Sequence, residues 1–165
     1  MKTITIIRHA KSDWSMEGQS DIDRSLNERG YSDAHNIGKL LKQKVLIPQV
    51  MISSPAIRAL STALIISDEI SFPKKNIRIE PDLYETGISE YLKVLKAIDK
   101  DIDSIAIFGH NPVISDLSSY LSGKAIEMPT CSVVRFCLLS GTWNSLSPNQ
   151  IEYIEMFSPK TIILT

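Results

Sequence analysis

A short run of β-branched residues near the start of this chain ends abruptly in a basic pair. Residues 3–7 (Thr-Ile-Thr-Ile-Ile) favour a pleated, packed backbone and predict a buried strand, which Arg8 and His9 follow directly. In open α/β sheets, ligands bind in the crevice beyond the carboxyl ends of the strands. A guanidinium beside an imidazole at such an end indicates an anion site, with phosphate the first candidate. Taken alone, the pattern also fits a solvated basic loop.

The length and charge of the chain narrow the possible functions. With 165 residues, 43% of them hydrophobic, the sequence fits a single domain over residues 1–165 with a sizeable core. A net charge of −1 argues against nucleic-acid binding, and no basic run suits a membrane surface. The first strand begins at residue 3, which leaves no room for a signal peptide, and no apolar run approaches the ~18 residues of a membrane span. We therefore expect a cytoplasmic protein.

The cysteines and histidines give little support for a metal. Cys131 and Cys137 fall in one expected strand, where their separation of about 20 Å lies beyond the reach of a disulfide. The three histidines and the absence of a Cys-x-x-Cys pair leave no good zinc constellation. The sequence therefore predicts neither a structural metal nor a cofactor.

Strands and helices alternate along the first part of the chain, which predicts a parallel sheet. Strands are expected at 3–7, 49–53, 77–80 and 104–108. Helices are expected from a cap at Ser25 or Asn27 to about 43, from Pro55 to about 72, after a cap at Ser89, and over 113–121.

The last third of the chain has a different pattern. Two strands, at 132–139 and 151–156, are joined by a turn-rich segment at 140–150 with no helix between them, so they are expected to pair antiparallel. The predicted fold class is α/β: a three-layer α/β/α domain whose sheet is mostly parallel and carries an antiparallel C-terminal strand pair.

Charged side chains follow each of the first four expected strands. Arg58 follows the second strand in the first turn of a helix, where a cation is electrostatically misplaced unless an anion lies beside it. Glu85 follows the third strand and His110 the fourth. Parallel strands place their carboxyl ends at one edge, so these residues are expected to meet Arg8 and His9 there.

This set of residues suits phosphoryl transfer. Two guanidiniums can hold a phosphoryl group through paired, planar hydrogen bonds. A neutral imidazole is a competent nucleophile toward phosphorus, and the neighbouring Arg8 and Arg58 should lower the pKa of His9. Positive groups around the equatorial oxygens stabilise the transition state, so the charge can come from side chains without a metal.

Three segments resemble the histidine phosphatase superfamily, which has the phosphoglycerate-mutase-like fold: Arg8-His9, Ser53-Ser54-Pro55-x-x-Arg58-Ala59 and Gly109-His110-Asn111. The short chain and the stretches Arg8-His9-Ala10-Lys11-Ser12, Leu26-Asn27-Glu28-Arg29-Gly30 and Gly109-His110-Asn111-Pro112 are similar to its SixA-type phosphohistidine phosphatases. The resemblance covers about residues 3–125.

The resemblance implies roles for individual residues. It makes His9 the nucleophile that becomes phosphorylated and assigns Arg8, Arg58 and His110 to the phosphate pocket. Position 10 is alanine, as in the SixA-like branch, where much of the superfamily has glycine. The chain also lacks the large helical insertions with which larger members enclose their substrates.

The remaining site residues are assigned from their positions in the loops. Glu85 is the first candidate for the proton donor to the leaving group, and Asp13 is the second. Lys11 and Ser12 are candidates for binding the phosphate or the rim of the substrate.

These observations predict a metal-independent phosphatase that works through a phosphohistidine intermediate. By resemblance, the substrate and partner is a phosphorylated protein of the histidine-phosphotransfer type, active in signalling. A phosphatase of small phosphate esters is the alternative, and a mutase is disfavoured because returning the phosphoryl group needs an enclosed site. A phosphate-binding or docking module without turnover is the alternative from a different class.

Overall fold

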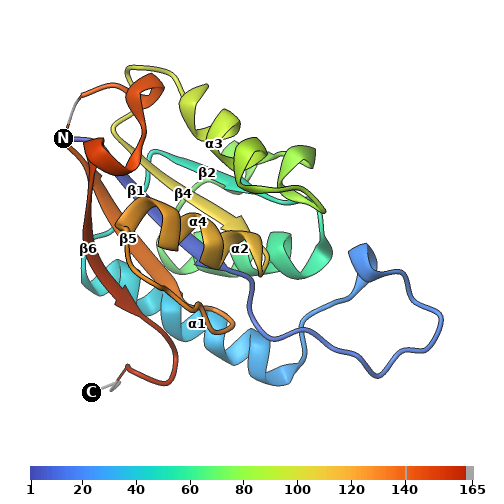
Figure 1. Cartoon of the computed structure of the whole chain (residues 1–165). Helices are drawn as coiled ribbons and strands as arrows, with labels where there is room; N and C mark the ends of the chain where they lie inside the picture. Colours follow the sequence, from blue (N-terminus) through green and yellow to red (C-terminus); the bar gives the residue numbers. More distant parts are fainter. Residues whose placement is uncertain (140, 163–165) are drawn as a thin grey trace.

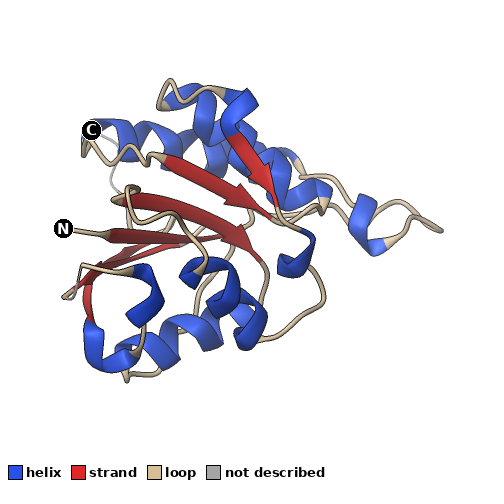
Figure 2. Cartoon of the chain, turned by 90° about the horizontal axis from the view of Figure 1, so that it is seen from above, coloured by secondary structure: helices blue, strands red, loops and turns tan. Residues whose placement is uncertain are grey.

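The computed structural model describes residues 1–139 and 141–162, which build one six-stranded sheet between two layers of helices (Figures 1 and 2). The strands lie in the order β3-β2-β4-β1-β5-β6. The strands are β1 (Thr3–Arg8), β2 (Val50–Ser53), β3 (Ile77–Ile79), β4 (Ser104–Gly109), β5 (Val133–Leu138) and β6 (Ile151–Phe157). The helices are α1 (Glu28–Gln43), α2 (Ile57–Glu69), α3 (Ile88–Lys96) and α4 (Val113–Ser122), with short 3-10 turns between elements. No helix within the described residues is both long and apolar enough to cross a membrane.

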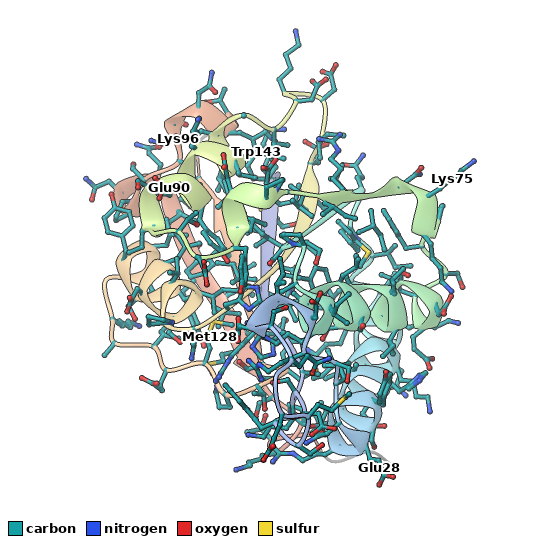
Figure 3. All side chains as sticks on the ribbon, turned by 90° about the vertical axis from the view of Figure 1, so that its right-hand side faces the viewer. Glu28, Lys75, Glu90, Lys96, Met128 and Trp143 are labelled. Carbon is teal, nitrogen blue, oxygen red and sulfur yellow. The ribbon has the colours of Figure 1, made fainter. Side chains whose placement is uncertain are left out.

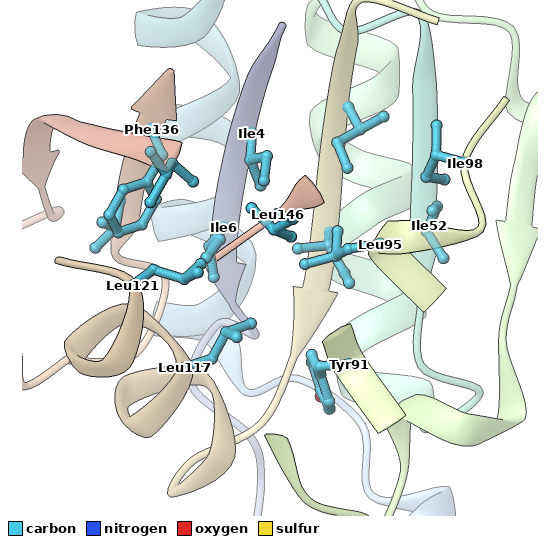
Figure 4. Close-up of a cluster of buried hydrophobic side chains, with 14 of the residues drawn as sticks. Ile4, Ile6, Ile52, Tyr91, Leu95, Ile98, Leu117, Leu121, Phe136 and Leu146 are labelled. Atoms are coloured by element: carbon cyan, nitrogen blue, oxygen red, sulfur yellow. The ribbon is translucent and has the colours of Figure 1, made fainter. Parts of the chain in front are cut away.

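The two faces of the sheet bury separate hydrophobic clusters. Ile4 and Ile6 point to the layer of α3 and α4, where Tyr91 and Leu117 pack against them in one cluster (Figure 4). Ile7 belongs to the cluster on the other face, with side chains of α1 and α2. This alternation is the period-two pattern of a strand that is covered on both faces. The predicted α/β class, with its antiparallel C-terminal pair, is confirmed.

Several element boundaries differ from those expected. The Asn27 side chain accepts a hydrogen bond from the backbone N–H of Gly30 at 2.8 Å, so Asn27 rather than Ser25 caps α1. Helix α2 begins at Ile57 rather than Pro55, because Ala56 still has extended backbone angles. Helix α3 begins at Ile88, before Ser89, and its cap is Gly87.

The C-terminal part also shows differences. Cys131 precedes β5 instead of sharing it with Cys137, because the chain turns there with a φ of 59° at Cys131. Both thiols are free and buried. The segment expected at 140–150 contains two 3-10 turns, and its residue 140 lies outside the described residues.

Three parallel strands end at the same level. Arg8 pairs with Gly109 across β1 and β4, and Ser53 pairs with Phe108 across β2 and β4. The alignment continues past the strands, because the N–H of His9 donates to Gly109 O and the N–H of Ser54 donates to Phe108 O, both at 3.1 Å. The residues after β1, β2 and β4 therefore start from one edge of the sheet.

Gly109 at the end of β4 has no room for a side chain. A Cβ built there would lie 2.2 Å from the hydroxyl oxygen of Tyr91, and that hydroxyl donates to Leu83 O at 2.9 Å. The phenol of Tyr91 thus ties the loop after β3 to the strand end that carries His110. Any larger residue at position 109 would push the phenol away.

We expect Gly109→Ala to lower the free energy of unfolding by about 1–3 kcal/mol, because it overpacks this contact. In a Tyr91→Phe background the same substitution should cost less, since the nearest remaining ring atoms would lie 3.0 Å from the new Cβ. Urea unfolding of the four proteins of this cycle measures the coupling. Gly141→Ala, where nothing lies within 4 Å, is the control. Equal costs of Gly109→Ala in both backgrounds would contradict the expected clash.

Candidate active site

A pocket of about 430 Å³ lies at the common edge of β1, β2 and β4. The structure brings all five residues predicted as catalytic to its wall, although they come from four separate parts of the chain: Arg8, His9, Arg58, Glu85 and His110. The other lining residues are Trp14, Asp21, Arg24, Leu83, Tyr84, Thr86, Tyr91, Asn111, Pro112 and Val113. The loop between β1 and α1 reaches outward from this edge (Figure 1).

The His9 imidazole is held in one orientation. It is 7% exposed, and its Nδ1 lies 2.7 Å from the carbonyl oxygen of Ala10. A carbonyl can only accept, so Nδ1 carries the proton and Nε2 keeps a free lone pair. Burial, together with the nearby His110, Arg58 and Arg8, lowers the pKa of His9 to about 3, against the effect of the Ala10 carbonyl. His9 is therefore neutral at pH 7, with a nucleophilic nitrogen.

His110 is positioned by a serine that the sequence did not single out. Its Nε2 lies 2.7 Å from Ser54 Oγ, while Ser54 Oγ also accepts from the N–H of Ala56 at 3.3 Å. The Ser54 hydroxyl proton is then free to point at Nε2, which leaves the His110 proton on Nδ1. Burial, and then Arg58, lower the pKa of His110 to about 4. The two histidine rings lie 5.2 Å apart, centre to centre.

Three buried nitrogen atoms of pocket-lining residues have no hydrogen-bond partner among the described residues: Nε of Arg8, Nε of Arg58 and Nδ1 of His110. Buried donors without a partner are rare, because each costs about 1–3 kcal/mol. Three at one pocket, two of them on cations, indicate a place for a ligand rich in acceptor oxygens. Arg8 is fixed for this by its Nη1, which donates to Met128 O at 2.8 Å (Met128 is labelled in Figure 3).

Asp21 is a site residue that sequence reasoning missed. Arg58 donates from Nη1 to the Asp21 carbonyl at 2.7 Å and from Nη2 to its carboxylate at 2.9 Å. Arg24 and Tyr84 also donate to this carboxylate, at 3.0 and 2.8 Å. Despite some desolvation, the hydrogen bonds from Tyr84, Arg58 and Arg24 hold the pKa of Asp21 at about 2.

This network corrects one expectation. The anion inferred from the misplaced cation at the start of α2 is in part Asp21 itself. Asp21 accepts one hydrogen bond from each terminal nitrogen of Arg58, while the Nε of that guanidinium has no hydrogen-bond partner among the described residues. The position of Arg58 at the N-terminus of α2 correctly indicated a nearby anion. Nothing in the sequence of the loop between β1 and α1 indicated which of its carboxylates would contact α2.

Of the remaining predicted residues, one lines the pocket and three do not. Glu85 lines the pocket, with a left-handed φ of 53°, whereas Asp13 is not among the lining residues and accepts from the N–H of Ser15 at 2.8 Å. Lys11 and Ser12 do not line the pocket either. The buried Ser12 hydroxyl accepts a hydrogen bond from Arg24, so it holds a pocket residue rather than facing the cavity. Within the described residues, no group of three or more His, Cys, Asp or Glu side chains could hold a metal ion.

Comparison with known proteins assigns the chain to a family. The model of the histidine phosphatase superfamily (branch 1) matches residues 4–102. The chain belongs to the histidine phosphatase superfamily. An uncharacterised chloroplast protein of Arabidopsis thaliana is 27% identical over 86% of this chain and 69% of its own length. A 2,3-bisphosphoglycerate-dependent phosphoglycerate mutase of Erythrobacter litoralis is 36% identical, but over only 42% of this chain and 31% of its own length.

Solved structures confirm the superfamily fold. The putative phosphohistidine phosphatase SixA from Agrobacterium tumefaciens superposes with a TM-score of 0.83, at 22% identity over 96% of this chain and 98% of that chain. A protein histidine phosphatase SixA complexed with tungstate gives 0.82, at 18% identity over 96% and 97%. Membership of the superfamily supports a phosphatase or mutase activity.

The lowered pKa values of His9 and His110 predict that the folded protein loses stability in acid. An unfolded histidine titrates near pH 6.5, so between that pH and about 3 the unfolded chain holds a proton that folded His9 lacks. The free energy of unfolding should therefore fall as the pH drops through this window, with His9 contributing up to about 1.4 kcal/mol per pH unit.

Urea unfolding between pH 7 and pH 4 checks this. In His9→Gln the slope should be shallower than in the wild type, and in the variant with His110→Gln as well it should be shallower still, because the pKa of His110 is also lowered by burial. Parallel pH profiles for wild type and His9→Gln would show that His9 is not held neutral by the fold.

Proposed function

We propose that this protein is a metal-independent phosphatase that works through a phosphohistidine intermediate at His9. The observation that supports it best is the set of unpartnered, buried donors on Arg8, Arg58 and His110 around a neutral imidazole. Each donor would gain a partner from a bound phosphoryl group. The two guanidiniums supply positive charge where the transition state develops negative charge.

The proposed reaction has two steps. In the first, the lone pair of His9 Nε2 forms a bond to phosphorus while the bond from phosphorus to the leaving group breaks, and the leaving atom takes that electron pair. The proton on Nδ1 stays on the ring, where its hydrogen bond to Ala10 O stabilises the positive charge of the phosphorylated imidazole. In the second step, water attacks phosphorus, the N–P bond breaks, and neutral His9 is restored with inorganic phosphate.

We assign the charged side chains to complementary parts of these steps. Arg8, Arg58 and His110 bind the phosphoryl oxygens. Asp21 holds Arg58 in place, and its low pKa makes it a fixed anion rather than a proton donor. Glu85 is the proposed proton donor for leaving groups that depart as strong bases, since it lines the pocket and Asp13 does not. Lys11 and Ser12 are left out of the proposed phosphate-binding set.

The proposal predicts that His9 carries the phosphoryl group. Wild-type protein should hydrolyse p-nitrophenyl phosphate in the presence of EDTA and be inhibited by vanadate, and His9→Ala should lose turnover. Acid-stable phosphate bound to the protein, or turnover that survives His9→Ala, would contradict it, because phosphohistidine is acid-labile. Phosphate binding without any turnover by the wild type would instead favour a docking module.

Phosphohistidine in a signalling protein, of the histidine-phosphotransfer type, is our proposed substrate. Two observations support it: the fold is shared with structures described as SixA phosphohistidine phosphatases, and the segment between β1 and α1, which lines the pocket, contains only a short 3-10 turn and no α-helix. Small phosphate esters are the alternative, because part of the chain, 42% of it, matches a 2,3-bisphosphoglycerate-dependent phosphoglycerate mutase. A panel with a phosphorylated phosphotransfer domain beside sugar and nucleotide monophosphates separates these cases by kcat/KM.

Glu85 should matter most where the leaving group is a poor one. An alkoxide needs a proton as it departs, whereas imidazole leaves far more readily, so Glu85→Gln should lower kcat/KM for alkyl phosphates by about 100-fold or more and for phosphohistidine much less. Asp13→Asn is the matched control and should leave both rates near those of the wild type. Equal losses on both substrates in Glu85→Gln would remove Glu85 from the role of proton donor.

A further inference from the structure

A large aromatic side chain lies open to solvent at the mouth of the pocket. Trp14 lines the same cavity as His9, yet it is 72% exposed, whereas Trp143 in the core is only 2% exposed. Exposed tryptophan surface is unfavourable in water. Burial of this ring in the core therefore does not explain its position, but a ligand that covers it would.

The indole is supported from beneath by a fixed cation. The Cζ atom of Arg24 lies 3.5 Å from the centre of the Trp14 ring, so the guanidinium stacks on one face of the indole. Arg24 is only 8% exposed, and it is held by Asp21 at 3.0 Å and by the hydroxyl of Ser12. One face of the ring is thus occupied, and the high exposure of Trp14 means that the other face is open.

The backbone that leads into Trp14 is also fixed, by hydrogen bonds to the end of the same loop. The N–H of Asp13 donates to Ser25 O at 2.8 Å, and the N–H of Asn27 donates to Lys11 O at 3.0 Å. The carboxylate of Asp13 then accepts from the N–H of Ser15, which closes a turn around Trp14. The ring is therefore presented by a preorganised segment, which reduces the entropy that binding would cost.

We propose that the open face of Trp14 stacks against a planar aromatic or heteroaromatic leaving group, and so selects substrates in which the phosphoryl group is joined to a ring. This inference rests on the proposed function, in which that ring is the imidazole of a phosphohistidine. It makes Trp14 a specificity-determining residue that contacts the substrate.

The reaction geometry places the leaving group near this ring. In an in-line displacement the leaving atom lies opposite the attacking nitrogen. His9 and Trp14 line the same cavity, and His9 is only 7% exposed whereas Trp14 is 72% exposed, so we place the leaving group on the solvent-exposed side of the cavity, beside Trp14. A flat ring leaving in that direction can stack on the indole, whereas an alkyl or ammonia leaving group cannot.

The test compares leaving groups that share a bond type but differ in the ring. Phosphoimidazole is paired with phosphoramidate, both with N–P bonds, and phenyl phosphate is paired with glycerol phosphate, both with O–P bonds. For each substrate the ratio of kcat/KM in wild type to that in Trp14→Leu removes intrinsic differences in reactivity. We expect a loss of about three- to tenfold for the two ring substrates, the size of one aromatic stacking contact, and less than twofold for the others.

Trp14→Phe is the matched control, because it keeps a flat ring and should restore most of the rate on ring substrates. A binding measurement adds a second readout: with vanadate bound, imidazole should quench a component of tryptophan emission that is present in the wild type and absent from Trp14→Phe.

The possible outcomes distinguish a failure of this inference from a failure of the proposed phosphatase function. Equal losses of Trp14→Leu on all four substrates would mean that Trp14 only supports Arg24, and would overturn the inference while leaving the phosphatase proposal intact. Failure of Trp14→Phe to restore the rate would also overturn it. No turnover of any substrate by the wild type would overturn the proposed function and this inference together.

Discussion

The site depends on the level register of three parallel strands. Pairing of β1 and β2 with β4 sets the ends of these strands side by side, so the residues that follow them start from one edge of the sheet. Backbone hydrogen bonds extend the alignment to His9 and Ser54. A shift of one residue would turn every side chain of a strand to the opposite face and separate the two histidines. The core that fixes this register is therefore also what assembles the pocket.

His9 and His110 stay neutral in the pocket, and arginine side chains lie close to both of them. Burial and neighbouring cations keep the proton off His9, and the carbonyl of Ala10 decides which nitrogen bears the remaining proton. Asp21 offsets part of the positive charge of Arg58 and Arg24. Close cations repel one another at short range in a poorly solvated site. The Asp21 carboxylate, paired with both guanidiniums, allows them to remain close together in the pocket.

Much of this arrangement could be predicted from the sequence, because several pocket residues come shortly after a strand in the chain. His9 and His110 each stand directly after a clear apolar run, and the rule that parallel strands end at one edge places them together. Asp21 and Ser54 could not be assigned in the same way. The contacts of Asp21 join a loop without periodicity to a helix 37 positions away, and the role of Ser54 depends on how its hydroxyl lies against one imidazole nitrogen.

Trp14, Asp21 and Arg24 all lie on the one segment between β1 and α1, whereas the atoms proposed to react lie on the strand ends. The two ends of this segment are held together by two backbone hydrogen bonds, from the N–H of Asn27 to Lys11 O and from the N–H of Asp13 to Ser25 O, so the part between them forms a closed loop outside the sheet. In the function that we propose, recognition and bond cleavage are thereby encoded in different stretches of the chain. Loops on a rigid scaffold tolerate change better than the scaffold does. Exchange of the outer part of this segment offers an evolutionary route to new substrates in which the chemistry is inherited unchanged.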